Sequence, residues 1–198
     1  TNNLPFTLEQ GIAMNSFLKY MASALFATPM IASAAVDLVT NGGFEADSQA
    51  SGTWNIYSSL TGWTGSPNIE LRNNVAGIAY EGGNFIELDT YSNSSMAQFL
   101  IGTPGLYQLS FWYSARPGTG ATNDLTFTFD GSAPVTVLNS ATNGGNDQNW
   151  LSYSTVINFD GNGLLTFNAI GASDGYSGSL DMVSFTSPIP DQIPTSCC

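Results

Sequence analysis

Carboxylates are the side chains of this chain best suited to chemistry, and two of them stand near its opposite ends. Glu45 ends the stretch Leu38–Glu45, an apolar run followed by a double-glycine turn, and Asp181 lies within Gly178–Phe185. Hard cations such as Ca²⁺ prefer several oxygen ligands, mostly carboxylates and backbone carbonyls. The pattern predicts that Glu45 ties a first strand to a last one near Asp181. The alternative is that Glu45 caps a turn and Asp181 accepts hydrogen bonds from backbone amides.

The sequence contains no histidine, which excludes catalytic triads built on histidine and zinc sites that use imidazole. The two cysteines, Cys197 and Cys198, are adjacent at the end of the chain. A vicinal pair on a tail cross-links no part of a fold, so we expect no disulfide framework.

A second group of side chains is suited to sugar binding. Trp112 alternates onto the polar side of its predicted strand, between Ser110 and Ser114. Sugar rings pack their C–H faces on aromatic rings, and their hydroxyls need polar partners. The alternative is that Trp112 closes one end of the fold and the arginines form surface ion pairs. The predicted polar partners are Gln108, Arg116, Arg72 and Asn73, while Trp54, Trp63 and Trp150 are predicted core or rim anchors.

Glu87 and Asp89 fall on one face of the predicted strand Asn84–Asp89, roughly 6–7 Å apart. Paired carboxylates serve as acid and base in glycoside hydrolysis. Acidic residues are common in this chain, and nothing else in the sequence marks a cleft beside this pair. We therefore expect no enzyme, and glycoside hydrolysis is the least favoured alternative.

The charge of the chain limits its partners. Three cations, Lys19, Arg72 and Arg116, stand against 15 acidic residues, which gives a formal net charge of −12. Nucleic acids and anionic lipids are bound by clustered Lys and Arg, so both are excluded as partners. Cations and neutral polysaccharides remain compatible with so acidic a surface.

The sequence divides into a leader, one domain and a tail. Residues 14–34 have the layout of a signal peptide: a short stretch ending in Lys19, an apolar run, and the small-x-small site Ala32-Ser33-Ala34. Residues 1–13 precede Met14 and are expected to be an upstream, non-native segment. Residues 35–186 form the expected domain, and residues 187–198 form a Pro-containing tail. The mature chain holds no run of about 20 apolar residues, so no membrane span is expected there.

The domain is predicted to be all-β. Short alternating runs are separated by Gly, Asn, Ser and Asp, with 21 glycines and 12% aromatic residues in the chain and no helical period. Tyr107, Leu109, Phe111 and Tyr113 fall on one predicted core face. Many short strands without helices favour an antiparallel two-sheet β-sandwich. The predicted strands are Val36–Thr40, Thr53–Ser58, Asn68–Arg72, Asn84–Asp89, Ser95–Ile101, Leu106–Ala115, Asp124–Asp130, Pro134–Leu138, Trp150–Phe159, Leu164–Ile170 and Ser179–Thr186.

With these elements in place, the sequence resembles the galactose-binding-like jelly rolls of exported bacterial proteins that carry a PEP-CTERM sorting tail. The tail departs from that pattern, because Ile189-Pro190-Asp191 is followed by neither an apolar segment nor a basic cluster. The sequence is also similar, more distantly, to jelly-roll carbohydrate-binding modules. The residues that carry the resemblance are Asn41–Glu45, Gly62-Trp63, Ile69–Leu71, Gly83–Asp89, Asn93–Gln98, Leu109–Gly118 and Leu180–Ser184.

The resemblance implies a structural calcium ion. In this sequence its ligands would be the carbonyl of Gly43, the carboxylate of Glu45, a carboxylate from Glu87 or Asp89, and Asp181. It further implies a secreted protein, extracellular or on a bacterial cell surface, that acts as a non-catalytic carbohydrate-binding or extracellular-matrix module. The expected partner is a polysaccharide or cell-surface glycan, and a monomer is expected. The main alternative is a structural surface protein that binds no sugar.

Overall fold

The computed structural model describes residues 35–116, 118, 124–137 and 148–187. The expected upstream segment, the signal peptide at 14–34 and all but the first residue of the tail lie outside these residues, as do Cys197 and Cys198. None of the described residues belongs to a helix long and apolar enough to cross a membrane.

The described residues form strands and turns, as the alternating sequence pattern predicts. The strands are β1 (Thr53–Leu60), β2 (Trp63–Asn73), β3 (Asn84–Glu87), β4 (Ser95–Ile101), β5 (Gly105–Ser114), β6 (Leu125–Phe129), β7 (Val135–Val137), β8 (Leu151–Phe159), β9 (Asn162–Ala169) and β10 (Ser179–Thr186).

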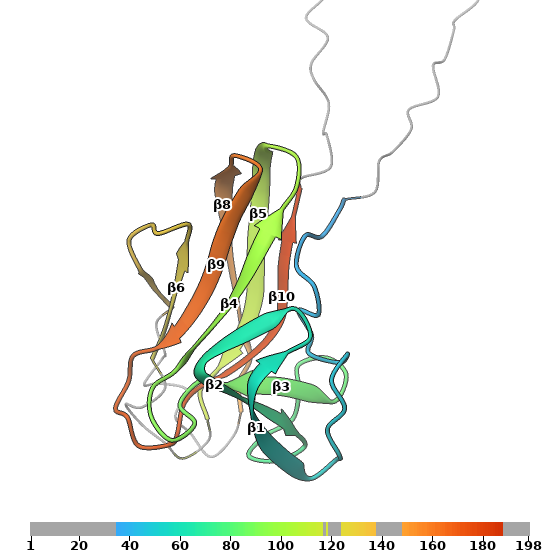
Figure 1. The fold of residues 1–198 in the computed structure, drawn as a ribbon. Helices are drawn as coiled ribbons and strands as arrows, with labels where there is room; N and C mark the ends of the chain where they lie inside the picture. The colour runs from blue at the N-terminus through green and yellow to red at the C-terminus, as the bar shows by residue number, and fades with distance from the viewer. Residues whose placement is uncertain (1–34, 117, 119–123, 138–147, 188–198) are drawn as a thin grey trace, which may run out of the picture. The chain divides into compact units, whose positions relative to one another are not determined.

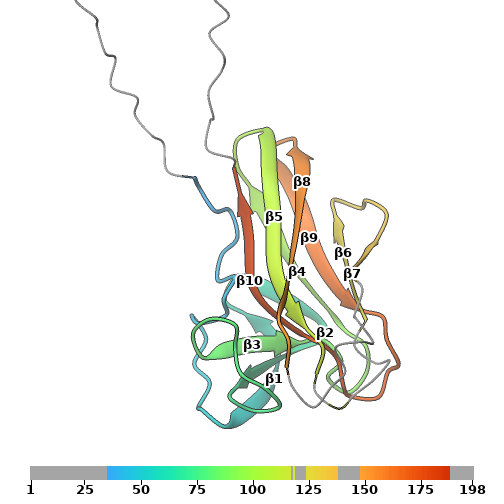
Figure 2. The ribbon, with the colours of Figure 1, turned by 180° about the vertical axis from the view of Figure 1, so that it is seen from behind.

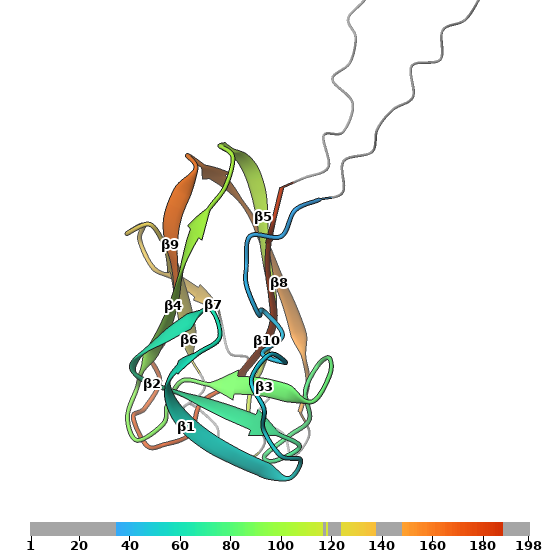
Figure 3. The same cartoon turned by 45° about the vertical axis from the view of Figure 1, so that its right-hand side comes forward.

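All of these strands pair antiparallel, in the order β7-β6-β9-β4-β2-β3-β10-β5-β8, with β1 added on β2. Figures 1 and 3 show two layers, with β4, β6 and β9 in one and β5, β8 and β10 in the other. β2 connects the layers, because Thr64–Ser66 pair with β4 whereas Glu70–Asn73 pair with β3. Pro67, which has no N–H to donate, lies between these two parts of β2. The predicted β-sandwich is confirmed.

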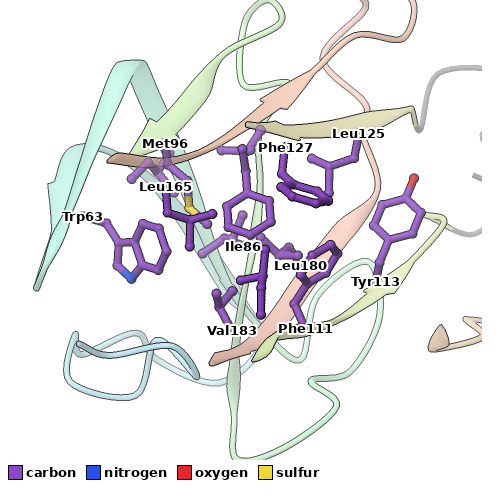
Figure 4. Packing of buried hydrophobic residues seen from close by; sticks show 14 of the residues in the cluster. Trp63, Ile86, Met96, Phe111, Tyr113, Leu125, Phe127, Leu165, Leu180 and Val183 are labelled. Atoms are coloured by element: carbon purple, nitrogen blue, oxygen red, sulfur yellow. The ribbon is translucent and has the colours of Figure 1, made fainter. Parts of the chain in front are cut away.

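The core lies between the two layers (Figure 4). On β5 the predicted core face is confirmed, since Tyr107, Leu109, Phe111 and Tyr113 are all at most 5% exposed. The ring of Phe111 lies 5.0 Å from that of Phe167 on β9, measured between centroids. Alternation along each strand therefore directs one set of side chains from each layer into a shared aromatic core.

The first predicted strand is wrong. Residues 36–40 make only an isolated bridge, between Asp37 and Thr186, and the backbone after them turns. Asn41 and Phe44 have φ values of 56° and 60°, which belong to the left-handed region and interrupt extended structure. This turn directs Phe44 inward, where it is fully buried and its ring centroid lies 6.0 Å from that of Trp63.

The two ends of the described chain nevertheless lie side by side. The N–H of Leu38 donates to the carbonyl of Phe185 at 3.0 Å, and the N–H of Val183 donates to the carbonyl of Gly42 at 3.0 Å. Backbone hydrogen bonds therefore connect the first segment to β10, although the first segment is not a regular strand. The sequence predicted a connection between these regions through Glu45, not through the backbone.

Gly42→Ala is expected to weaken this connection. A Cβ at Gly42 would lie 1.8 Å from the carbonyl oxygen of Val183, so the two segments would have to separate. Forcing an extra methyl into a packed site costs about 1–3 kcal/mol of unfolding free energy. Gly43→Ala is the matched control, because its added Cβ would have Met182 Sδ at 3.7 Å as nearest atom. Urea unfolding of both variants is the measurement, and equal losses would contradict the account.

Candidate functional site

Two arginines and two glutamates form one charge cluster in the interior beside β3. The Nε of Arg72 donates to Glu70 Oε1 at 2.5 Å, and its Nη2 pairs with Glu87 Oε2. Arg116 Nη1 lies 3.4 Å from both carboxylate oxygens of Glu87. Arg72 is only 2% exposed and Glu87 is fully buried. Charges so deeply buried require partners, and here each has them.

Strand register explains why this cluster forms. Glu70 on β2 is directly opposite Glu87 on β3, so two like charges would repel across the pair of strands. Arg72 follows Glu70 by two residues and therefore projects from the same face of β2. Its guanidinium reaches both carboxylates, and this contact converts a repulsive pair into a bridged one.

Burial raises the pKa of Glu87 to about 8, against the opposing effect of Arg72. The charge of Glu70 acts in the same direction as burial, and the charge of Arg116 opposes it. The interior therefore favours a neutral Glu87 carboxyl up to about neutral pH, while the two guanidinium groups lower the pH at which it ionises.

An open cavity of about 310 Å³ lies over this cluster, and we call it the arginine pocket. Trp54 and Tyr176 are 52% and 44% exposed, so each presents ring surface there. The guanidinium carbon of Arg116 lies 4.4 Å from the centroid of Tyr176, a cation–π contact that fixes both side chains. The lining includes Trp54, Glu70, Arg72, Thr90, Arg116, Asp174 and Tyr176.

Two polar atoms in the lining residues lack partners. Within the described part of the chain, neither Nη1 of Arg72 nor Oγ1 of Thr90 makes a hydrogen bond, although both atoms are buried. An unsatisfied buried donor costs about 1–3 kcal/mol, so such groups usually meet water or a ligand. The arginine pocket thus combines aromatic surface with hydrogen-bonding groups that have no protein partner.

The structure brings together only part of the predicted sugar site. Arg72 and Arg116 converge, as expected of two residues in one site, but Trp112, Gln108 and Asn73 do not line the arginine pocket. The remaining three residues have partners of their own. Trp112 is half-buried and its ring stacks on Tyr80 with centroids 3.8 Å apart. Gln108 donates to Ser154, and Asn73 donates to the carbonyl of Gln49.

Trp54, rather than Trp112, is the tryptophan that lines the arginine pocket. It was expected to be a core or rim anchor, yet it lies on β1, which pairs with β2 alone among the described strands. The structure, and not the sequence pattern, reveals that this part of β1 faces solvent, because Thr53–Asn55 are all exposed. Trp63, by contrast, is 1% exposed and is a core residue as expected.

Glu45 and Asp181 hold the two sides of one loop, Tyr80–Asn84, which we call the 80–84 loop. Glu45 Oε1 accepts hydrogen bonds from the N–H groups of Gly83 and Asn84, at 2.8 and 2.7 Å. Asp181 Oδ2 accepts from those of Tyr80 and Glu81, at 2.9 and 3.2 Å. The two carboxylates from opposite ends of the chain are therefore connected through backbone amides.

The other two predicted metal ligands lie elsewhere. Glu87 pairs with two arginines, so its charge is already balanced without a cation. Asp89 Oδ2 accepts hydrogen bonds from the N–H groups of Asp174 and Gly175. No cluster of three or more acidic, His or Cys side chains suited to a metal occurs among residues 35–116, 124–137 and 148–187. Both Glu87 and Asp89 are fully buried, and neither lines the arginine pocket as a hydrolytic pair would.

Asp181 differs from Glu45 in its surroundings. It is fully buried, and burial raises its pKa to about 7, while the charge of Glu45 acts in the same direction. Its hydrogen bonds from the amides of Glu81, Met182 and Tyr80 lower the pKa and offset part of this effect. A cation near Asp181 would favour its ionised form.

Comparison with known proteins identifies the fold. No family model and no curated protein matches the chain. Among solved structures, it is similar to a cyclase from Fischerella sp. TAU, at 15% identity and a TM-score of 0.55, over 80% of this chain and all of the cyclase. It is similar to a family 16 carbohydrate-binding module at 15% identity and a TM-score of 0.51, covering 76% and 99% of the two chains.

An arabinose-bound α-L-arabinofuranosidase is similar over 75% of this chain but only 26% of its own length, at 13% identity and a TM-score of 0.51. At such identities the likeness establishes the fold alone. This chain therefore has the β-sandwich fold that occurs in a solved carbohydrate-binding module, and the same fold occurs in a cyclase and within a glycosidase.

The two buried acids predict how stability depends on pH in calcium-free buffer. The folded-state pKa of Glu87 is about 8 against an ordinary 4.5, and that of Asp181 is about 7 against 3.8. Between the ordinary and the raised values, the folded state therefore binds more protons than the unfolded state. The free energy of unfolding should therefore fall as pH rises from about 5 to about 8, by at most about 1.4 kcal/mol per pH unit for each group.

Urea unfolding across this range is the measurement. Glu87→Gln should flatten the slope, because it removes one of the two titrations. Glu81→Gln is the matched control, since Glu81 is exposed. A free energy of unfolding that rises steadily from pH 5 to pH 8 would contradict the burial argument.

Proposed function

We propose that this protein is a secreted, non-catalytic carbohydrate-binding module that holds part of a polysaccharide or cell-surface glycan in the arginine pocket. The observation that carries the proposal is the combination in one cavity of exposed Trp54 and the unpartnered Nη1 of buried Arg72. The fold shared with a solved carbohydrate-binding module supports the same class.

The chemistry of the lining suits a sugar. The C–H face of a pyranose packs on an indole ring, and Trp54 offers one that is half exposed. The hydroxyls need both donors and acceptors, which Arg72, Thr90 and Glu70 supply together. At about 310 Å³ the cavity is at the small end of ligand sites, so it suits one or two rings of a longer glycan.

In this site Trp54 is the aromatic platform in place of the predicted Trp112, and Arg72 and Arg116 remain predicted ligand-binding residues. Arg116 is held by both Glu87 and Tyr176, so it can shape one wall without rearranging. Glu87 stays in the charge cluster beneath the cavity, where it positions the guanidinium groups.

We further propose a structural calcium ion at the 80–84 loop, held by Glu45 and Asp181. The donor set fits in part: these two carboxylates approach the same loop, and the charge of Glu45 raises the pKa of Asp181. Backbone carbonyls, with that of Gly43 expected among them, would have to complete the coordination. Bound there, the ion would supply positive charge between the two chain ends. Glu87 and Asp89 are left out of this site because they have other partners.

A structural surface protein without sugar binding is the alternative, and one observation favours it. β8 is an edge strand of nine residues without a charged residue or proline, and such edges often pair with other chains. Glycan binding by the native protein decides between the two.

Trp54→Ala is expected to weaken glycan binding about 5- to 30-fold, since a stacking contact contributes on the order of 1–2 kcal/mol. A glycan array identifies the sugar, and calorimetry with that sugar measures the loss. Tyr91→Ala is the control, because Tyr91 is 79% exposed and does not line the pocket. Absence of any glycan binding by the native protein, or equal loss in both variants, would refute the site.

Calcium is expected to raise the melting temperature of the native protein, and a chelator to reverse the rise. Glu45→Gln keeps an acceptor for the amides of Gly83 and Asn84 but removes the charge, so it should abolish the calcium-dependent shift. Asp89→Asn should retain that shift, because Asp89 accepts hydrogen bonds from the amides of residues 174 and 175 and is not a ligand in the proposed site. Loss of the shift in Asp89→Asn alone would instead favour the ligand set first predicted.

A further inference from the structure

A second open cavity lies along the outer edge of β8, facing the β6–β7 hairpin, and we call it the β8 groove. It encloses about 600 Å³, more than the arginine pocket, and shares no lining residue with it. Figure 2, which views the fold from behind, shows β8 and the β6–β7 hairpin on the same side of the fold. The lining includes Phe127, Phe129, Val135, Tyr153, Val156 and Ile157.

One wall of the groove is an unpaired strand edge. β8 pairs with β5 through all nine of its residues, and no other described strand pairs with it. The opposite edge of an antiparallel strand presents the N–H and C=O groups of every second residue. Natural edge strands are usually protected by lysine, proline or a bulge, and Leu151–Phe159 contains no charged residue or proline and pairs with β5 in unbroken register.

The floor of the groove is apolar and incompletely covered. Tyr153 and Ile157 alternate onto the inner face of β8, yet both are only half-buried, unlike Phe159 at 1% exposure. The ring of Tyr153 lies 5.3 Å from that of Phe127 across the gap between the layers, measured between centroids. Val135 and Val156 are 38% and 64% exposed at the rim. An added strand would bury this surface by placing every second side chain into the groove.

The charge of the groove is negative. Asp130 and Asp160 both belong to the lining, and both are exposed. They follow β6 and β8 directly and lie toward one end, since the N–H of Asp130 donates to the carbonyl of Leu164 at the start of β9. Both arginines of the described residues are in the charge cluster, and neither lines this groove.

We infer that the β8 groove binds an extended peptide segment of a partner protein, which adds to β8 as a further strand. The segment carries apolar side chains at every second position, which pack on Tyr153 and Ile157, and one or two Lys or Arg residues beside Asp130 and Asp160. Residues 153–158 of β8 span roughly 20 Å, which accommodates a partner strand of five or six residues. Main-chain pairing gives affinity, and the alternate side chains and the charge give specificity.

Charge favours such a partner over a second copy of this chain. Each copy carries a formal net charge of −12. Pairing β8 with its own counterpart would join two chains of this charge, and neither described arginine lines the groove to offset it. A basic segment is instead attracted to Asp130 and Asp160.

A fluorescent peptide, acetyl-Lys-Lys-Val-Thr-Val-Thr-Val-amide, is the probe, and fluorescence anisotropy with the full chain is the measurement. We expect binding that weakens at least about tenfold when two valine amides of the probe are N-methylated, because strand pairing is lost. Replacing both lysines of the probe with glutamate should weaken binding by at least about threefold. Amide hydrogen exchange should slow at residues 153–158 when the probe binds.

Val156→Lys places a charge on the exposed edge and should abolish probe binding, and Asn158→Lys on the same edge is a second blocking variant. Phe99→Ala is the control, since Phe99 is 57% exposed and lies on β4, outside the groove. Binding that survives N-methylation, or no binding at millimolar probe, overturns the inference. Sedimentation that shows a dimer broken by Val156→Lys would also overturn it, because a second copy would then be the occupant. Glycan binding is measured separately, so failure of either site leaves the other test intact.

Discussion

The contact of Arg72 with two opposing glutamates is a constraint on which the interior beside β3 depends. Glu70 and Glu87 must face each other because of the β2–β3 register, and neither could be buried as a charge without the guanidinium between them. A buried ion pair adds little net stability, since desolvation offsets most of the attraction. Its value here is positional: it fixes the floor of the arginine pocket and leaves one nitrogen of Arg72 without a partner among the described residues.

Much of the fold was predictable because strand alternation is a local property. The inward faces of β5, β6 and β9 follow from sequence spacing alone, and most strands lie where the pattern placed them. The first segment was mispredicted because its apolar residues suggested a strand, whereas the left-handed backbone of Asn41 and Phe44 turns the chain. Nothing in the side-chain pattern distinguishes an apolar turn that plugs the core from an apolar strand.

The candidate site was predictable only in part, for a physical reason. Glu45 and Asp181 were predicted to share a cation, whereas the contacts in the structure are backbone amides of the 80–84 loop that donate to both carboxylates. Backbone groups of this kind leave no mark in a sequence. Arg72 and Arg116 were predicted to lie together and do line one cavity, but the tryptophan beside them is Trp54 rather than the predicted Trp112. Which of two tryptophans remains exposed depends on which neighbours cover it, here Tyr80 over Trp112, and such contacts are set by the whole fold.

The adjacency of the two chain ends has a mechanical consequence. Residues 36–38 and 185–187 are joined by a few backbone hydrogen bonds, and in Figure 1 they lie away from β1. A tension applied to the two ends of the described chain would break these hydrogen bonds one after another. It would not load all the hydrogen bonds between the strands at the same time. Force would thus separate the first segment from β10 before it reached the strands that carry Trp54 and Arg72. A module built in this way can yield a short length of chain under load while its binding surface keeps its shape.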